Sequence, residues 1–446
     1  MDDGSQVDTK EKRRLIGRAP GRIDLMGGAG AHMGSLVLLT TTAEAAWATT
    51  ELRGDARIVV YNPQMADCGW RDHAEFSLAD LSGDECVRDL VSAPGLRWSA
   101  HALGAFFLLK EWFPDRITYG ANVYLKSDIP MGRGVGASAA VGVALMKTIA
   151  SAYGIGLAGA ELAEACQWVE SIIAESPSGV ASQLASALGD EGHFLPLLCQ
   201  PCQPRMAVLL PPELKLWVVA SSAPRAAAPD CDAARAATFM AYKMICDWEG
   251  LTVLPDEASR IPRWTDPNWK GYLANVAPSL FRSNYELRLP ETLTAAEFLG
   301  NGQTHVDPFT QIVPGIVYHP RACARQVIEE NLRARLFLEL ARAGTGFEEM
   351  GELMYQSHFA YTQSGLGSEA ADQVVSLVCE EGPSKGLYGA RITGAGSGGT
   401  VVVLGRNDAG AAMARVVELF AGLEGRPPLI FEGSSMGADR FGILEG

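Results

Sequence analysis

A glycine-rich loop followed by an alanine-rich apolar run carries the clearest chemical signal in this sequence. The segment from Ser127 to about Ala150 reads SDIPMGRGVGASAAVGVALMKTIA, which predicts a turn, a loop and then a helix. Glycines let the backbone approach an anion closely, and the first-turn amides of a helix lack intrahelical partners, so this loop favours a phosphate. The residues expected to contact phosphate are Gly132, Gly134, Gly136, Ala137, Ser138 and Ala139.

Two better-known phosphate loops do not fit this stretch. A Walker loop requires Gly-Lys-Ser/Thr, which does not follow the glycines. A dinucleotide loop requires an acidic residue about 20 positions later, and residues 152–156 contain no carboxylate. A tight loop that packs small residues against a sheet remains an alternative at this level. In the phosphate interpretation, Ser138 supplies a hydroxyl to a phosphate oxygen or to its magnesium ion.

The composition describes a large acidic chain. It has 446 residues, of which 48% are hydrophobic, enough for two domains or perhaps three. Asp and Glu number 52 against 37 Lys and Arg, and the resulting net charge of −15 argues against nucleic acid or an anionic membrane surface as partner. A local basic pocket for phosphate is compatible with this balance. We therefore expect a small-molecule substrate and a monomer or homodimer.

The first residues and the cysteines indicate a cytoplasmic protein. The start, MDDGSQVDTKEKRR, is polar and charged rather than a leader, and no apolar run reaches the length of a transmembrane helix. Nine cysteines without a secretory leader predict reduced thiols. Cys199-Gln-Pro-Cys202 has no second pair nearby, and we interpret it as two thiols at the end of a strand.

Apolar patterning predicts a mixed α/β chain. Residues 17–28 are expected to form a strand, a turn and a short helical or irregular piece, and residues 255–318 an irregular stretch. Further strands are expected at Leu36–Leu39, Thr41–Thr50, Ala56–Tyr61, Ala121–Leu125, Gly192–Cys199, Leu214–Ser221, Ala390–Thr393 and Thr400–Leu404. Helices are expected at Trp98–Trp112, Glu161–Ser176, Gln183–Leu188, Ala233–Trp248, Arg321–Ala343 and Gly410–Leu423. A proline-rich stretch at 200–205 is the candidate domain boundary.

Three separated segments, taken together, resemble a known family. They are Arg18-Ala-Pro-Gly-Arg-Ile-Asp-Leu-Met-Gly-Gly28, Pro130-x3-Gly-Val-Gly-Ala-Ser-Ala-Ala140 and Ile392-Thr-Gly-Ala-Gly-Ser-Gly-Gly399. Their order and separation resemble the three motifs of the GHMP kinases (galactokinase, homoserine, mevalonate and phosphomevalonate kinases). Within that family, the segments Leu353–Ser368 and Arg321–Asn331 are most similar to the galactokinase branch, especially to L-arabinokinase-like sugar kinases.

The resemblance implies a two-domain α/β (α+β) GHMP kinase fold. A flexible tail at residues 1–14 would precede a ribosomal-S5-like ATP-binding domain at 15–205. A ferredoxin-like C-terminal domain would follow at 206–446, with the active site between the two. Such enzymes use ATP and Mg²⁺ to phosphorylate the anomeric hydroxyl of a sugar.

The resemblance also implies roles for individual residues. Arg22 matches the arginine beside the reacting groups, where its charge would stabilise the transferring phosphoryl. Ser138 and Glu170 match the magnesium ligands, and both are hard oxygen donors. Residues matched to substrate binding are Asp24, Gly28, Ala31, His32, Gly179, Cys231, Gly394, Gly396 and Gly398. From the residues alone, an exposed helix glutamate is the favoured interpretation of Glu170, and structural roles are favoured for Asp24 and His32. A surface arginine is an equal alternative for Arg22.

The sequence departs from the family at the positions that would bind the sugar and accept its hydroxyl proton. The family's catalytic aspartate falls on Ser182, in Gly179-Val-Ala-Ser-Gln183, and a serine hydroxyl is a poor base near neutral pH. A sugar-binding aspartate falls on Ala31, and a sugar-contacting tyrosine corresponds, more loosely, to Cys231. Asp24 and His32 are alternative polar groups in the first motif, and whether Glu175 or Asp190 replaces the lost carboxylate stays open.

Three functions remain open at this stage. The favoured one is an ATP-dependent kinase for a sugar or sugar-like acceptor, which works with Ser182 because phosphoryl transfer depends largely on positioning and charge. The second is a catalytically silent protein that binds nucleotide or sugar as a sensor or partner subunit. The third is an enzyme that uses the same phosphate cradle for another reaction.

Overall fold

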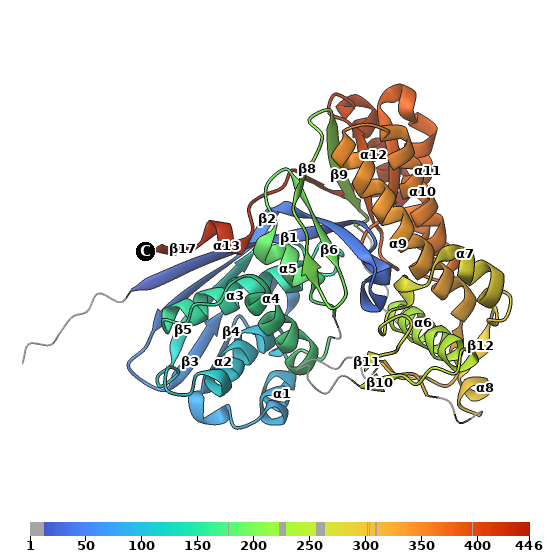
Figure 1. Cartoon of the computed structure of the whole chain (residues 1–446). Helices are drawn as coiled ribbons and strands as arrows, with labels where there is room; N and C mark the ends of the chain where they lie inside the picture. The colour runs from blue at the N-terminus through green and yellow to red at the C-terminus, as the bar shows by residue number, and fades with distance from the viewer. Residues whose placement is uncertain are drawn as a thin grey trace, which may run out of the picture.

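The computed structural model describes most of the chain and arranges it around two β-sheets. The described residues are 13–176, 178–222, 229–255, 264–300, 302, 304–307, 310–394 and 396–446. In Figure 1 the N-terminal sheet and its helices form the left half of the molecule, and helices α6 to α12 form the right half. Residues 1–12, most of the predicted tail, lie outside the described residues.

The first sheet has the strand order β17-β1-β2-β5-β3-β4, and β6 pairs with β2 beside this path. All neighbours are antiparallel except β3 and β5, which are parallel. Its strands are β1 (Arg14–Met26), β2 (Leu36–Leu52), β3 (Arg57–Tyr61), β4 (His73–Ser77), β5 (Ala121–Ser127), β6 (His193–Leu198), β7 (Gln203–Pro204), β8 (Val208–Leu209) and β17 (Ile443–Glu445). The two stretches predicted as separate strands at 36–39 and 41–50 form the single strand β2.

Apolar helices cover this sheet. Helix α3 packs on β1 and β2 and contacts α2, α4 and α5, which surround it. Residues of α2 and α3 such as Leu103, Phe106, Val143 and Leu145 are fully buried, which explains why both helices are apolar on nearly every face. The helices of this half are α1 (Asp84–Ser92), α2 (Ala100–Trp112), α3 (Ala137–Ala152), α4 (Gly159–Trp168), α5 (Ala181–Leu188) and α13 (Ala438–Phe441).

The second sheet is antiparallel, with the order β14-β15-β9-β16. Its strands are β9 (Leu214–Ala220), β14 (Leu387–Ile392), β15 (Thr400–Arg406) and β16 (Leu429–Glu432). Helices separate β9 from β14, β14 runs directly into β15, and α12 leads to β16, which is the βαββαβ arrangement of a ferredoxin-like domain. Its helices are α6 (Pro229–Trp248), α9 (Pro320–Ala343), α10 (Phe347–Gln363), α11 (Glu369–Glu381) and α12 (Gly410–Glu424).

The stretch predicted as irregular contains only short elements among its described residues. They are β10 (Leu254–Pro255), β11 (Trp264–Thr265), a 3-10 turn at Leu273–Asn275, α7 (Pro278–Leu280), a π-helical turn at Phe281–Tyr285, β12 (Leu293–Thr294), α8 (Ala295–Leu299) and β13 (Val317–Tyr318). A core of aromatic and aliphatic side chains holds this stretch against α6 and α9; Trp269, Phe281 and Tyr285 are buried in it.

The first motif is a bulged strand rather than the predicted strand and turn. β1 runs without interruption to Met26, and its pairing with β2 shifts register between Pro20 and Arg22 and again between Asp24 and Met26. Such bulges bend a strand and redirect its side chains. The short helical piece that was expected follows as a 3-10 helix at Gly28–Met33.

The two halves meet where β1 ends. The backbone amides of Gly27, Ala29 and Leu36 donate to the side chains of Glu330, Tyr361 and Asn331, which belong to α9 and α10. At the other end of the chain, β17 pairs with β1 and so returns to the first sheet. The division at residue 205 stays a prediction.

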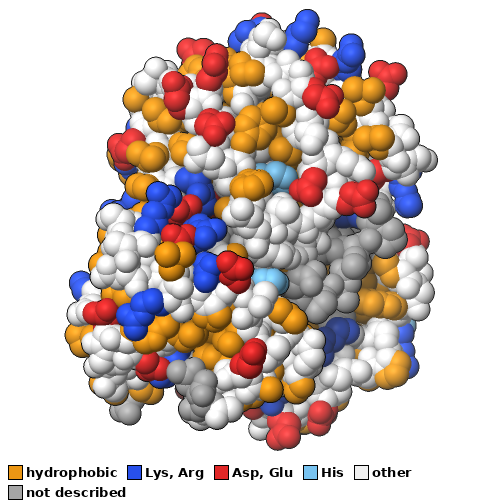
Figure 2. All heavy atoms as spheres, turned by 90° about the vertical axis from the view of Figure 1, so that its right-hand side faces the viewer, with side chains coloured by type: hydrophobic (Ala, Val, Ile, Leu, Met, Phe, Trp, Pro, Cys, Tyr) orange, Lys and Arg blue, Asp and Glu red, His pale blue; other side chains and the backbone are white. Residues whose placement is uncertain are grey.

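Charges on the face that carries the C-terminal helices are mixed. Figure 2 shows Lys and Arg side chains gathered with Asp and Glu side chains among them. Ion pairs such as Arg282–Glu329, Arg325–Glu286 and Arg321–Glu291 link α9 to the segment before it. Among the described residues, no helix is both long enough and apolar enough to cross a bilayer.

Candidate active site

Arg22 joins three elements of the first half. From β1, its Nε donates to Oγ of Ser182 in α5 at 2.9 Å, and one terminal nitrogen donates to the carbonyl of Gly134 at 2.6 Å. Its backbone amide donates to the Val135 carbonyl at 2.9 Å. Burial lowers the pKa of the guanidinium, while Asp24 and Glu170 raise it. The result is a fixed positive charge between the glycine loop and α5.

The glycine loop has the predicted form of a loop followed by a helix. Gly132, Gly134 and Gly136 all adopt positive φ angles, and α3 begins at Ala137. The first amide with an intrahelical acceptor is that of Ala140, which donates to the Gly136 carbonyl. The amides of residues 137–139 therefore have no acceptor within the helix, as a phosphate site at this helix terminus requires.

Glycine is required at position 136 by two independent facts. Its φ is 77°, a left-handed conformation, and a Cβ there would lie 2.8 Å from Cγ of Arg22. The absence of a side chain thus brings the loop and the arginine together.

Ser138 and Glu170 lie side by side. Ser138 Oγ donates to one carboxylate oxygen of Glu170 at 2.7 Å, and the side-chain amide of Gln183 donates to the other. Glu170 is only 5% exposed, so it is not the solvated helix glutamate that the sequence also allowed. The predicted helix at 161–176 is corrected: α4 ends at Trp168, and a π-helical turn at Val169–Ile173 carries Glu170. Such turns widen a helix and redirect its side chains, often at functional sites.

This pair fits a magnesium ion that is shared with phosphates. Among the described residues, no group of three or more His, Cys, Asp or Glu side chains is placed to hold a metal. Magnesium, however, is usually bound by one or two carboxylates with the remaining positions filled by substrate phosphates and water. One buried carboxylate and one hydroxyl beside a free helix N-terminus match that donor set.

A pocket of about 230 Å³ opens next to Arg22, and most of the residues predicted to bind substrate line it. It lies between the first motif, the start of α5, the start of α6 and the end of α10. The predicted residues that line it are Arg22, Asp24, Gly28, Ala31, His32, Gly179, Ser182, Cys231 and Gly394. They come from both halves of the molecule, which places the pocket at the junction.

Asp24 is the buried acid of this pocket. It is 2% exposed, and neither carboxyl oxygen makes a hydrogen bond of normal geometry within the described residues. The carboxylate occupies the space that a side chain at position 28 would need, because a Cβ on Gly28 would lie 1.7 Å from Oδ2. Burial raises the pKa of Asp24, and the charges of Arg391 and Arg22 and the Gly28 amide oppose that rise.

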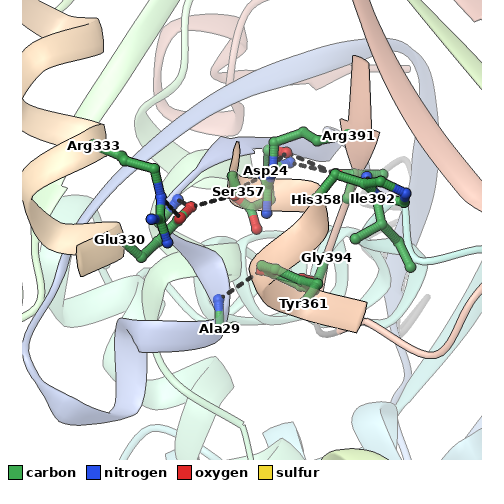
Figure 3. A network of polar contacts seen from close by, with 12 residues as sticks. Asp24, Ala29, Glu330, Arg333, Ser357, His358, Tyr361, Arg391, Ile392 and Gly394 are labelled. Atoms are coloured by element: carbon green, nitrogen blue, oxygen red, sulfur yellow. Dashed lines mark hydrogen bonds and ion pairs between the residues drawn. The ribbon is translucent and has the colours of Figure 1, made fainter. Parts of the chain in front are cut away.

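A network of buried polar groups supports Asp24 from the second half (Figure 3). A terminal nitrogen of Arg391 lies 3.5 Å from Oδ1 of Asp24, and the guanidinium carbon lies over the Tyr361 ring, 4.8 Å from its centroid. The Tyr361 hydroxyl accepts from the Ala29 amide and donates to the Gly394 carbonyl. Glu330 in turn accepts from Ser357 and Arg333. The Asp24 carboxylate is therefore not an isolated buried charge, because the positive charge of Arg391 lies beside it.

His32 and Ala31 form one part of the pocket wall, where the resemblance predicted substrate contacts. The His32 ring lies tilted against Phe239 with ring centroids 5.7 Å apart, and its Nε2 is buried without a hydrogen-bond partner in the described part of the chain. Burial and the nearby Arg235 lower the pKa of His32 to about 3, so the ring is neutral. Arg235 itself makes a bidentate ion pair with the buried Asp307 at 2.8 Å.

The C-terminal glycine loop only partly reaches the pocket. Gly394 lines it, and a Cβ there would lie 3.1 Å from the Gly134 carbonyl, so the two glycine loops touch. The Cys231 thiol lies 3.8 Å from the Gly396 carbonyl, and the Gly398 carbonyl accepts from Ser368. Neither Gly396 nor Gly398 is among the described lining residues, and Ala395 lies outside the described part.

The two alternative carboxylates point elsewhere. Glu175 is exposed and ion-pairs with Arg97 at 3.0 Å, while Asp190 pairs with Arg440. Neither lines the pocket in the described structure, and Asp24 is the buried carboxylate that does. The Ser182 hydroxyl therefore has the Arg22 guanidinium beside it, and neither Glu175 nor Asp190 supplies a carboxylate to this part of the pocket.

The comparisons with known proteins agree with this geometry. A model described as GHMP kinases N terminal domain matches residues 100–190, and one described as GHMP kinases C terminal matches residues 336–421. The chain belongs to the GHMP kinase family. Within it, the similarities below place the chain in the galactokinase branch.

Two curated proteins illustrate the relationship. The chain is 31% identical to L-arabinokinase of Arabidopsis thaliana over 97% of its own length, but spans 47% of that longer protein. It is 27% identical to galactokinase of Chloroflexus aurantiacus, with 92% of the chain and 89% of the relative covered. Lactococcus lactis galactokinase, solved in complex with galactose, has a TM-score of 0.75 at 20% identity and covers 96% of this chain and 95% of its own. The last likeness concerns the fold alone.

Several site residues escaped the sequence analysis. Arg391 directly precedes the C-terminal glycine loop, and a lone arginine inside the apolar strand β14 is the signal that could have drawn attention to it. Tyr361 lay within the segment that suggested the galactokinase branch. Gln183 was noted only as the neighbour of Ser182, although it holds the metal-ligand candidate Glu170.

Proposed function

We propose that this protein is an ATP-dependent kinase that transfers the γ-phosphoryl group to the anomeric hydroxyl of a sugar or sugar-like acceptor. The observation that carries the proposal is the position of Arg22. It is hydrogen-bonded to the glycine loop on one side and to Ser182 at the acceptor pocket on the other. A cation fixed between a phosphate cradle and a pocket is what phosphoryl transfer demands.

In this proposal the glycine loop and the first turn of α3 hold the nucleotide phosphates. The amides of residues 137–139 and the helix dipole face the anion, and Ser138 with Glu170 holds the magnesium ion. When bound, that ion neutralises charge on the phosphates. Gln183 and the π-helical turn keep the Glu170 carboxylate in one orientation.

The acceptor lies in the pocket beside Arg22. The acceptor oxygen forms a bond to the γ-phosphorus while the bond from that phosphorus to the β,γ-bridging oxygen breaks, and ADP leaves. Because the transition state is loose, the acceptor proton does not have to be removed before attack and passes to the transferred phosphoryl group. The carboxyl oxygens of Asp24 and Nε2 of His32, which have no hydrogen-bond partner in the described residues, bond hydroxyls of the acceptor. This chain thus uses positioning where the family uses an aspartate.

One observation favours a second candidate, a nucleotide- or sugar-binding protein without turnover. Ser182 stands where a base is expected, and neither Glu175 nor Asp190 lines the pocket in the described structure. The ligand-binding groups would then be retained while transfer is lost.

The deciding experiment is detection of phosphorylated product by mass spectrometry. Native protein and Ser182→Asp are incubated with ATP, magnesium and a panel of pentoses, hexoses, uronic acids, heptoses and cyclitols. Product from the native protein supports the kinase and names its acceptor. Product from Ser182→Asp alone identifies a scaffold disabled at one position. If neither forms product although ATP with magnesium raises the melting temperature, the binding protein is correct.

A further inference from the structure

A second chamber adjoins the acceptor pocket. We call it the side chamber and define it by Gln167, Cys199, Cys202, Trp264 and Tyr272, which line it and do not line the acceptor pocket. It encloses about 110 Å³. The two chambers share six lining residues, which are Ala31, His32, Ser178, Gly179, Ala181 and Arg235. The two chambers are therefore immediate neighbours that meet at these residues.

Small side chains line the region where the two chambers meet. Ala31, Gly179 and Ala181 present at most a methyl group where the two chambers meet. By the resemblance, an aspartate would stand at position 31, and its longer side chain would project from this shared wall. The alanine that is present leaves this part of the wall without a polar or bulky side chain.

The side chamber presents aromatic walls held in place by packing. The Trp264 indole nitrogen donates to the Gly271 carbonyl at 2.8 Å, and its ring meets Phe239 edge-on with centroids 4.9 Å apart. The Tyr272 ring lies against Gly34, where a Cβ would come within 2.6 Å of it. Rigid aromatic surfaces of this kind bind the apolar C–H face of a sugar ring at low entropic cost.

Two polar atoms without a hydrogen-bond partner in the described residues lie where the chambers meet. Ser178 Oγ and His32 Nε2 are both buried, and neither has a hydrogen-bond partner within the described residues. Both residues line both chambers. Buried polar groups are normally satisfied, so these atoms are placed to bond a ligand that crosses from one chamber to the other.

The side chamber is suited to a neutral ligand. No Asp or Glu is found among the described residues that line it. Arg235 is compensated by its bidentate pair with Asp307, and the buried His32 ring is neutral because its pKa is low. A charged substituent would find no opposite charge here, whereas hydroxyl groups would find Ser178 and His32.

We infer that the acceptor is a neutral reducing disaccharide. Its reducing ring lies in the acceptor pocket beside Arg22 and Ser182, and its second ring lies in the side chamber against Trp264 and Tyr272. The hydroxyls near the glycosidic link bond Ser178 and His32. This inference rests on the proposed function for the identity of the reducing ring, and concerns which molecules that site selects.

Calorimetry without ATP tests the inference separately from turnover. Neutral reducing disaccharides built from common pentoses and hexoses are titrated into the native chain beside their component monosaccharides. At least one disaccharide should bind tenfold more tightly than either component. Trp264→Ala and Tyr272→Ala should each abolish the tighter binding of the disaccharide. Two variants are used so that the test remains possible if one of them does not fold. Trp70→Ala is the matched control, because Trp70 is 43% exposed and lines neither chamber.

The outcomes separate the two proposals. If no disaccharide binds more tightly than its components, or if the advantage survives in both folded variants, the disaccharide inference is wrong. If a disaccharide is preferred but is never phosphorylated with ATP and magnesium, the two-ring binding site stands as a disaccharide site and the kinase proposal fails. Phosphorylation of monosaccharides alone, without any preference for disaccharides, overturns the inference and leaves the kinase proposal intact.

Discussion

Arg22 and Ser182 are joined by a 2.9 Å hydrogen bond from the guanidinium Nε to the serine Oγ, although 160 positions separate them in sequence. A carboxylate at position 182 would form an ion pair with this arginine. The serine leaves the guanidinium with a neutral acceptor instead, so more of its positive charge remains for other anions. In the proposed kinase, that charge is directed at the transferring phosphoryl group.

We expect Ser182→Ala to change kcat by less than about threefold. The hydroxyl is not a base, and its loss removes one hydrogen bond worth about 1 kcal/mol while the Gly134 carbonyl still holds Arg22.

Arg22→Lys should lower kcat about a hundredfold, because an ammonium group cannot bond Ser182 and Gly134 at the same time with the geometry of a guanidinium. Steady-state kinetics on the acceptor found above measure both. A large loss in Ser182→Ala would show that the serine takes part in the chemistry.

The loop and helix at 127–150 could be predicted because the signal is local. Glycine spacing and apolar composition determine them without any distant contact, and the three ordered motifs identified the family. The surroundings of Asp24 could not be predicted. They depend on Gly28, which leaves space for the carboxylate, and on Arg391, which lies far away in sequence and reaches it only through the packing of two sheets.

The environment of Glu170 illustrates the same limit. Helical spacing predicted a continuous helix there, but burial against Ser138 and Gln183 accompanies a π-helical turn that no apolar pattern reveals. The side chamber was also hidden from sequence analysis. Trp264 and Tyr272 belong to the stretch predicted as irregular, and tertiary packing alone brings them to Cys199 and Ala31.

Glu170→Gln should raise the magnesium concentration for half-maximal activity more than about tenfold. The amide keeps the shape of the side chain but removes the negative charge that a magnesium ion requires. Activity is measured against magnesium at saturating ATP. Glu161→Gln is the control, because Glu161 lies exposed on the preceding helix α4. Equal magnesium curves for the two variants would remove Glu170 from the metal site.

Stability should fall between pH 7 and pH 5 partly because of His32. Burial lowers its pKa in the folded chain to about 3, whereas the unfolded chain takes up a proton near pH 6.5. The unfolded state therefore binds more protons over this window, so stability is lost as the pH falls. From pH 6.5 to pH 5 the loss from this residue is about 2 kcal/mol.

Urea denaturation at pH 7 and pH 5 checks this expectation. In His32→Gln, the difference between the two unfolding free energies should be about 2 kcal/mol smaller than in the native chain. His73→Gln, at an exposed histidine, should retain the native difference. A native pH dependence in His32→Gln would mean that His32 is not held neutral.

Gly136→Ala and Gly132→Ala separate backbone strain from contact with Arg22. Both glycines have left-handed φ angles, 77° and 72°, so alanine costs about 1 kcal/mol at either position. A Cβ at 132 meets nothing within 4 Å, whereas a Cβ at 136 lies 2.8 Å from Cγ of Arg22. We expect Gly136→Ala to cost at least about 1 kcal/mol more than Gly132→Ala.

The kinetic comparison of these two variants is more informative than their stability. Displacement of Arg22 in Gly136→Ala should lower kcat about a hundredfold, because misplacement of a charge by a fraction of an ångström weakens its hold on the transition state. Gly132→Ala should lose little kcat unless its methyl group meets the bound nucleotide, which would appear as a raised KM for ATP. Equal kcat in both variants would show that the position of Arg22 does not depend on Gly136. The phosphate loop and the acceptor pocket would then not be coupled through this contact.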